Sequence, residues 1–314
     1  MVFTEILEKA KMLPPVVKVG MGGLVILLIG FFCFFYSKPD EERSRPLARQ
    51  IPPSEGSPQD LAEAITLYSQ ETVEADPDRE AFVEDFWRWI FGEAGIPERI
   101  ARKVAASALE SPAFVMELLE VLQSDPYTYR LVDKQNALPF DYEPDDLVSL
   151  TGGTYRLGRE GLTLRKIAAE ALDEMAAAAT AEGVVLTIGS AYRSAAYQAQ
   201  VYEREVSAYG RETADRQSAR PGNSQHQLGL IVDFAPIDDA FAGTPTSQWL
   251  LRNASRFGFS LSYPNGYEEV TGYRWESWHY RYVGRDLAAF IDTYFDGIQQ
   301  YALLFIQAWQ EQAR

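Results

Sequence analysis

The chain contains only two histidines, and each lies in a short segment that also carries a carboxylate. His226 precedes Asp233 in SQHQLGLIVD, and His279 follows Glu276 in ESWHYRYVG. Catalytic zinc sites take three protein ligands, from neutral imidazole and carboxylate, and keep a fourth position for water. We therefore expect a zinc site formed by His226, Asp233 and His279, with Glu276 as the base that removes a proton from the water.

Each feature of this predicted site also has a structural interpretation. A histidine near an aspartate can be a hydrogen-bonded structural pair, and this is the more common case for either histidine considered alone. Glu276 could likewise be a hydrogen-bond acceptor for a metal ligand and not a base. The occurrence of both histidines in segments of this kind favours the metal site.

The local pattern around both histidines predicts strands. The apolar residues 230–232 indicate a strand that begins just after Gly229, whose missing side chain would let the backbone turn close to a metal. The aromatic-rich residues 274–283 indicate a second strand. Residues three apart on a regular strand face opposite sides, so Glu276 and His279 share a site only if the strand twists, bulges or ends between them.

These segments resemble the VanY-like D-alanyl-D-alanine carboxypeptidases, in a wider group that includes D-Ala-D-Ala dipeptidases and the hedgehog signalling domain. The motif Ser-x-His-x-x-Gly-x-x-x-Asp matches Ser224, His226, Gly229 and Asp233, and Glu-x-Trp-His-x-Arg-Tyr-Val-Gly matches residues 276–284. Supporting matches extend the resemblance over residues 131–286, about half the chain. Ile231 departs from the small residue that many relatives carry, which leaves the fine substrate preference open.

The resemblance implies a mechanism and further site residues. Zinc would bind the scissile carbonyl oxygen and a water, and Glu276 would deprotonate that water and later protonate the leaving amine. Arg193 matches an arginine that stabilises the developing oxyanion, although it could instead form a salt bridge that ties down a loop. Ser224 and Gln198 are expected near the substrate, and the Ser224 hydroxyl could alternatively cap a turn.

Three functions are consistent with this sequence. The first is a zinc D,D-carboxypeptidase that removes the C-terminal D-Ala from peptidoglycan stem peptides or their precursors. The second is another peptidoglycan peptidase on the same scaffold, either an L,D-carboxypeptidase or an endopeptidase. The third is a non-catalytic cell-wall binding protein that keeps the metal for stability. Glu276 argues against the third, because a purely structural site does not need an additional carboxylate beside the metal.

The N-terminal part of the sequence predicts a membrane anchor. Residues 19–36 form an uncharged run of eighteen residues, long enough for a transmembrane helix, and no small-x-small cleavage site follows it. Residues 1–18 would then be cytoplasmic. Lysine and arginine on both sides leave the orientation open, but a peptidoglycan substrate would place the catalytic part on the extracytoplasmic side of a single-pass protein. The single cysteine, Cys33, lies in this run and excludes an intramolecular disulfide.

Two regions separate the predicted anchor from the catalytic part. Residues 37–58 contain five prolines and few apolar residues, as expected of an extended linker. Residues 59–124 have helical periodicity and lie in the most acidic part of a chain of net charge −16. This helical region could bind a protein partner or could be a solvated surface packed on the catalytic domain. An acidic chain without a basic stripe argues against nucleic-acid binding.

The remaining sequence predicts an α+β catalytic domain over residues 125–286. Helices are expected over 162–181, 195–209 and 247–257, and a strand over 184–188 precedes Arg193. We expect a small antiparallel sheet with helices on one face and the zinc cleft on the other. Residues 287–314 form a predicted C-terminal helix, rich enough in large apolar residues to dock on the helical region, a partner or a membrane surface.

Overall fold

The computed structural model describes residues 77–110 and 112–312, which divide into two compact units. The boundary falls at Asp125, and the second unit ends at Leu303, so that residues from Leu304 onward belong with the first. The predicted anchor at 19–36, the linker at 37–58 and the first part of the predicted helical region lie outside the described residues. Within the described part of the chain, no helix has both the length and the apolar character needed to cross a bilayer.

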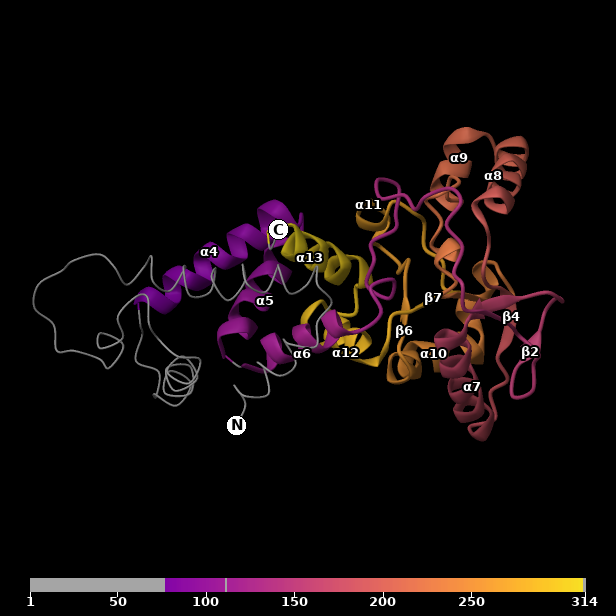
Figure 1. Cartoon of the computed structure of the whole chain (residues 1–314), viewed down its shortest axis with the longest axis horizontal. Coiled ribbons are helices and arrows are strands. Elements are labelled where there is room, and N and C mark those ends of the chain that lie inside the picture. The colour runs from indigo at the N-terminus through magenta and orange to yellow at the C-terminus, as the bar shows by residue number, and fades with distance from the viewer. Residues whose placement is uncertain (1–76, 111, 313–314) are drawn as a thin grey trace, which may run out of the picture. The chain divides into compact units, whose positions relative to one another are not determined.

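The first unit is helical. It contains α4 (Pro77–Glu93), α5 (Glu98–Glu110), α6 (Pro112–Gln123) and the end of α13 (Gln299–Gln312) (Figure 1). Aromatic contacts hold these helices together, with the ring of Phe305 5.9 Å from Phe114 and 6.2 Å from Trp89 between centroids. The C-terminal segment therefore packs on the helical region, as its apolar residues predicted.

The second unit contains a sheet of five strands and a separate pair. The order in the larger sheet is β2 (Arg156–Leu157), β4 (Thr187–Ser190), β5 (Ile231–Phe234), β7 (His279–Tyr282) and β6 (Phe259–Leu261). The pair consists of β1 (Leu147–Ser149) and β3 (Thr163–Arg165). All pairings are antiparallel except that of β2 with β4, so the prediction of a wholly antiparallel sheet was wrong at this edge.

Most helices of the second unit agree with those predicted from the sequence, but some residues predicted as helix form other structure. The helices are α7 (Lys166–Ala181), α8 (Ala195–Tyr209), α9 (Arg211–Gln217), α10 (Pro245–Asn253), α11 (Glu268–Thr271) and α12 (Arg285–Tyr294), with short 3-10 turns at Gln225–Leu228, Asp239–Gly243 and Ala254–Phe257. The prediction of a helix over 195–209 is confirmed. Residues 163–165, predicted as helix, instead form β3, because they pair with β1.

The described C-terminal residues form two helices, so the single helix predicted over residues 287–314 was wrong. The chain breaks between α12 and α13, where Asp296 and Gly297 both have positive φ, of 53° and 75°. The N–H of Gly297 bonds back to the carbonyl of Ile291 at 3.2 Å and closes the end of α12.

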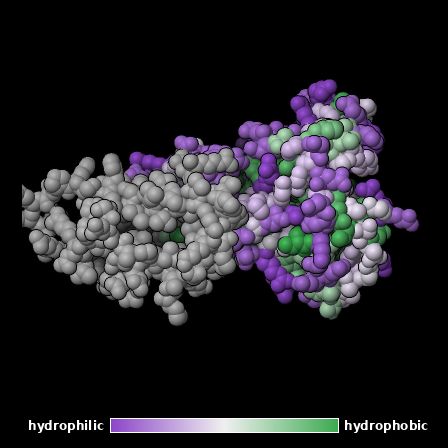
Figure 2. Space-filling view, viewed as in Figure 1, coloured by the Kyte–Doolittle hydropathy of each residue, from purple (hydrophilic) through white to green (hydrophobic). Residues whose placement is uncertain are grey.

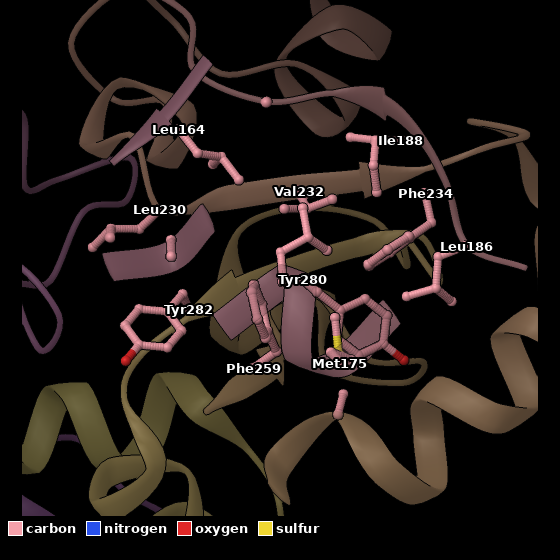
Figure 3. Packing of buried hydrophobic residues seen from close by; sticks show 14 of the residues in the cluster. Leu164, Met175, Leu186, Ile188, Leu230, Val232, Phe234, Phe259, Tyr280 and Tyr282 are labelled. Carbon is pink, nitrogen blue, oxygen red and sulfur yellow. The ribbon is translucent and has the colours of Figure 1, made fainter. Parts of the chain in front are cut away.

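The two faces of the sheet differ in polarity because side chains alternate along each strand. Val232 and Phe234 of β5, and Tyr280 of β7, point into the hydrophobic core together with Met175 of α7 (Figure 3). Asp233 and His279 therefore lie on the opposite face of the same two strands. On the face of this unit seen in Figure 2, hydrophilic residues cover most of the surface, with smaller hydrophobic patches between them.

A buried arginine fixes the segment that opens the second unit. Arg281 of β7 is fully buried, and its Nη2 donates to the carbonyls of Tyr127, Thr128 and Arg130 at 3.0, 3.1 and 2.7 Å. Burial lowers the pKa of Arg281 to about 9, so these carbonyls supply the dipoles that keep its charge stable inside the fold.

Gly229 joins the turn that carries His226 to β5. Its φ is 69°, and a Cβ there would lie 2.9 Å from the side chain of Arg165 and 3.1 Å from those of Leu147 and Pro144. The sequence suggested close approach to a metal, but the structure shows that the crowding comes from the β1–β3 pair. Gly161 has a similar φ of 72° and open space around it.

Replacing Gly229 with alanine should therefore destabilise the fold by about 2–5 kcal/mol, the sum of left-handed strain and overpacking. Gly161→Ala should cost only about 1 kcal/mol, since it has the strain without the clash. Urea unfolding of both variants checks this difference. Equal losses would show that the packing around Gly229 is not what requires glycine.

Candidate metal centre

His226 is held by the 3-10 turn Gln225–Leu228 and is buried. Its Nδ1 lies 2.6 Å from the carbonyl oxygen of Ala191, at the end of β4. A carbonyl can only accept, so Nδ1 carries the proton and Nε2 presents a lone pair. Nε2 faces Asp233, 3.1 Å from Oδ2. Burial lowers the pKa of His226 to about 4, so the ring is neutral at pH 7.

His279 is the first residue of β7 and is paired directly with Asp233 of β5. Its Nδ1 lies 3.0 Å from Asp233 Oδ1, and its Nε2 lies 3.3 Å from Oε1 of Gln225. That amide oxygen also accepts the hydroxyl of Ser262 at 2.8 Å. Nε2 of His279 therefore donates to Gln225, which leaves the Nδ1 lone pair facing Asp233.

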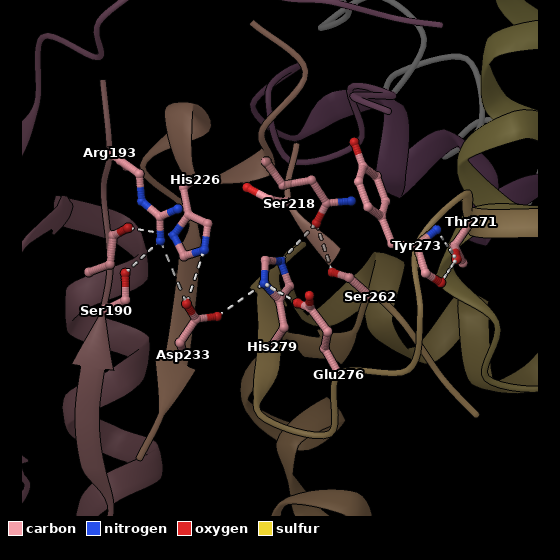
Figure 4. A network of polar contacts seen from close by, with 12 residues as sticks. Ser190, Arg193, Ser218, His226, Asp233, Ser262, Thr271, Tyr273, Glu276 and His279 are labelled. Atoms are coloured by element: carbon pink, nitrogen blue, oxygen red, sulfur yellow. Dashed lines mark hydrogen bonds and ion pairs between the residues drawn. The ribbon is translucent and has the colours of Figure 1, made fainter. Parts of the chain in front are cut away.

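Asp233 lies between the two imidazole rings (Figure 4). It is 4% exposed, and no hydrogen-bond donor reaches its Oδ1 among the described residues. Burial opposes the charged form of Asp233, whereas the positive charge that either imidazole carries when protonated lowers its pKa. With both rings neutral, the guanidinium of Arg193, 4.0 Å from Oδ2, supplies positive charge that favours the carboxylate.

The three side chains form a donor set that fits a divalent metal. One potential ligand atom from each of His226, Asp233 and His279 lies within 4.8 Å of the others. The hydrogen bonds to Ala191 and Gln225 leave all three atoms as acceptors that face one another. Three buried acceptors without a shared donor are unfavourable, whereas two imidazole nitrogens and a carboxylate are the ligands that zinc prefers.

Glu276 lies beside this set and comes from the loop before β7. The strand begins only at His279, after a turn in which the His279 N–H bonds to the Glu276 carbonyl at 3.2 Å. The three-residue spacing therefore does not separate the two side chains: Oε2 of Glu276 lies 3.5 Å from Nδ1 of His279. Burial, reinforced by the charge of Asp233, raises the pKa of Glu276 well above its ordinary range.

Arg193 lies on the other side of Asp233, between β4 and α8. Its Nη2 is 4.0 Å from Asp233 Oδ2 and donates to Ser190 Oγ at 3.1 Å, and its Nη1 donates to Oε1 of Gln198 at 2.8 Å. The closer contacts of Arg193 are thus neutral oxygens, whereas a salt bridge that tied down a loop would have a carboxylate in this position. Burial lowers the pKa of Arg193, against the opposing effect of Asp233.

The two residues expected near the substrate have different surroundings. Gln198 uses its amide within the protein, because Nε2 donates to the carbonyl of Ala219 at 2.6 Å while Oε1 accepts from Arg193. Ser224 is buried at the start of the turn that carries His226, and its hydroxyl does not cap that turn.

Sequence reasoning missed Gln225 and Ser262, which orient His279. Gln225 lies between Ser224 and His226, at a position that the motif leaves variable. Ser262 is 37 residues further along the chain. Neither position has a spacing signal, because the contact depends on how β6 returns to the sheet.

Comparison with known proteins identifies the family. Residues 161–285 match the model of the VanY family, described as D-alanyl-D-alanine carboxypeptidase. The matched segment includes His226, Asp233, Glu276, His279 and Arg193. Residues 161–285 therefore belong to the VanY family. The VanY match begins just before β3 and ends at the first residue of α12, so the helical unit and α13 lie outside it.

Individual VanY relatives cover the same part. The chain is 38% identical to YodJ of Bacillus subtilis (strain 168) over 180 residues, which are 55% of this chain and 66% of that protein. It is 34% identical over 167 residues to the D-alanyl-D-alanine carboxypeptidase of Enterococcus faecalis, covering 50% of this chain and 59% of that one. The chain thus spans less than two thirds of these curated relatives.

The fold also resembles a solved relative. The vancomycin-resistance D,D-dipeptidase VanXYg, in complex with a D-Ala-D-Ala phosphinate analogue, superposes with a TM-score of 0.51 at 26% identity, covering 58% of this chain and 72% of that chain. A mixed fold of small sheets and helices is thus common to both.

The contacts around the VanY-type donor set predict different roles for two buried glutamines. Gln225→Leu removes the acceptor that orients His279 and should weaken zinc binding roughly 10–100-fold. Gln198→Leu removes a contact of Arg193 and should leave the zinc dissociation constant near that of the wild type. Titration against a competing chelator measures both.

A conservative variant separates orientation from general damage to the fold. Gln225→Glu keeps an acceptor for His279 and should bind zinc more tightly than Gln225→Leu. If all three variants lose zinc equally, the hydrogen bond to Gln225 does not set the metal affinity.

Proposed function

We propose that the chain is a zinc-dependent peptidase that removes the C-terminal D-Ala from peptidoglycan stem peptides or their precursors. The observation that carries this proposal is the buried donor set of His226, Asp233 and His279, with Glu276 beside it, inside the segment that matches the VanY family. The alternative, a metal kept only for stability, does not account for a second carboxylate, 13% exposed, that lies 3.5 Å from a ligand nitrogen.

The residues would hold zinc through Nε2 of His226, Nδ1 of His279 and the carboxylate of Asp233. A zinc ion bound there supplies a Lewis acid for the peptide carbonyl and lowers the pKa of a coordinated water. The cleft for the peptide would then lie on the face of the sheet opposite the hydrophobic core.

Glu276 would act as the general base and then the general acid. It takes a proton from the attacking water and returns it to the amine that leaves as free D-Ala. Its buried position favours the protonated form, which suits the second of these steps. Arg193 would stabilise the negative charge that develops on the carbonyl oxygen, and Ser190 and Gln198 hold its guanidinium in place. Ser224 would contact the substrate, whereas Gln198 would act through Arg193.

Removing the Glu276 carboxylate should abolish turnover without removing the metal. Glu276→Ala should release D-Ala from a pentapeptide ending in D-Ala-D-Ala at least about 100-fold more slowly, which is the range expected of a general base. Zinc content should stay at the wild-type level, because Glu276 is not one of the three donors. Glu269→Gln, an exposed carboxylate nearby in the chain, provides the control.

Two results would contradict the D,D-carboxypeptidase proposal. If zinc is bound and only a tetrapeptide ending in a single D-Ala is shortened, the enzyme is an L,D-carboxypeptidase. If internal cross-links of whole peptidoglycan are cut instead, it is an endopeptidase. Full activity in Glu276→Ala would remove Glu276 from the mechanism and leave the base unassigned.

We further propose a single-pass protein of the cytoplasmic membrane, with the catalytic unit on the extracytoplasmic side. The uncharged run at residues 19–36 supports the anchor, and a peptidoglycan substrate supports the orientation. The acidic helical region remains a candidate site for a protein partner.

This location predicts the behaviour of the chain in cell fractions. The full chain should sediment with membranes, and deletion of residues 1–36 should release it. Protease added to intact spheroplasts should digest the catalytic unit while a cytoplasmic marker survives. Protection of the catalytic unit until the spheroplasts are lysed would refute the orientation.

A further inference from the structure

A group of positive charges lies close to Arg193. The strand β2 pairs with β4 in parallel, with Leu157 opposite Ile188, so both strands end at the same edge of the sheet. Arg159 follows β2 at this edge, and Arg193 follows β4. Gly158, which joins β2 to Arg159, contacts the backbone of β4, where its N–H bonds to the Ile188 carbonyl at 2.7 Å. The parallel pairing therefore brings Arg159 toward Arg193.

Tyr197 and Arg204 of α8 complete this group. Tyr197 lies in the first turn of α8, where its N–H bonds to Ser194 Oγ at 3.2 Å, and it is 37% exposed. Cζ of Arg204 lies 5.9 Å from the centre of the Tyr197 ring. Arg204 is the main cause that lowers the pKa of the Tyr197 hydroxyl, and Arg159 acts on the same hydroxyl in the same direction.

Two guanidinium groups thus lie near one neutral side chain. Within residues 77–110 and 112–312, no carboxylate oxygen lies within 4.0 Å of either of them. Other exposed arginines of this unit do have acidic partners, such as Arg216 with Glu268 and Arg220 with Asp215. Like charges repel, and the chain as a whole has a net charge of −16. An unneutralised cationic group in such a protein fits an anionic ligand.

We propose that Arg159, Tyr197 and Arg204 form a recognition site for a carboxylate of the peptide substrate, borne on the residues that precede the scissile bond. Guanidinium groups suit carboxylates because their planar donors match the two oxygens. The side chain of Arg193 is only 15% exposed and lies beside Asp233, whereas Arg159 and Arg204 are exposed. The exposed group would therefore meet a part of the peptide that stays at the surface, and not the residue that is released.

This inference rests on the proposed peptidase function and is tested with two peptides. The pentapeptides Ala-Glu-Lys-D-Ala-D-Ala and Ala-Gln-Lys-D-Ala-D-Ala differ only in one carboxylate. The wild type should have a KM for the Gln peptide about three- to fivefold higher than for the Glu peptide, the range expected of exposed ion pairs. In Arg159→Ala and Arg204→Ala this ratio should fall toward one. Arg252→Ala, an exposed arginine on α10, should keep the wild-type ratio.

The outcomes separate this inference from the proposed function. Equal KM values for the two peptides in the wild type would overturn it, as would a ratio that survives in both arginine variants. If the wild type cleaves neither peptide, the proposed function fails. The dissociation constants of both peptides for the Glu276→Ala protein, measured by calorimetry, then test whether Arg159 and Arg204 recognise the carboxylate. Tighter binding of the Glu peptide, lost when Arg159 and Arg204 are both replaced, supports the site, and equal binding overturns it.

Discussion

The arrangement of the catalytic unit depends on a buried anion between two neutral imidazoles. Asp233 faces Nε2 of His226 at 3.1 Å and Nδ1 of His279 at 3.0 Å, and the outward nitrogens of both rings already donate to protein oxygens. This leaves a cluster of acceptors whose residues are only 3–5% exposed, an arrangement that is unfavourable without a cation. The pairing of β5 with β7, the turn at Gly229 and the contacts of Gln225 all serve to hold these three side chains together.

The same arrangement explains how neighbouring residues acquire opposite roles. Asp233 is buried and Glu276 is largely shielded, with its side chain 13% exposed, but only Asp233 lies between two imidazoles. Positive charge at this position, on a protonated ring or a bound cation, lowers the pKa of Asp233, while burial raises that of Glu276. One carboxylate suits metal binding and the other suits proton transfer. Arg193 adds a positive charge on the opposite side, where Ser190 and Gln198 fix its guanidinium through neutral contacts.

The sequence indicated which residues form the candidate site, but not the hydrogen bonds that orient their side chains. Two scarce histidines beside carboxylates were sufficient to propose the donor set, and α8 followed from its periodicity. The tautomers depend on Ala191 and Gln225, which no spacing indicates, and the parallel edge strand β2 is too short to show a pattern. Residues 163–165 became a strand because pairing with β1 outweighs a helical period. The break at Asp296 and Gly297 was hidden by the apolar residues on either side, although Gly297 was a visible signal for a helix end.

The most direct test of this account is the position of the metal itself. Crystals of the zinc-loaded chain, measured on both sides of the zinc absorption edge, would locate the ion by its anomalous scattering. We expect a single strong peak bound by Nε2 of His226, Nδ1 of His279 and the carboxylate of Asp233, with Glu276 unbound. A peak elsewhere, coordination through the other ring nitrogens, or no peak at this position would contradict it.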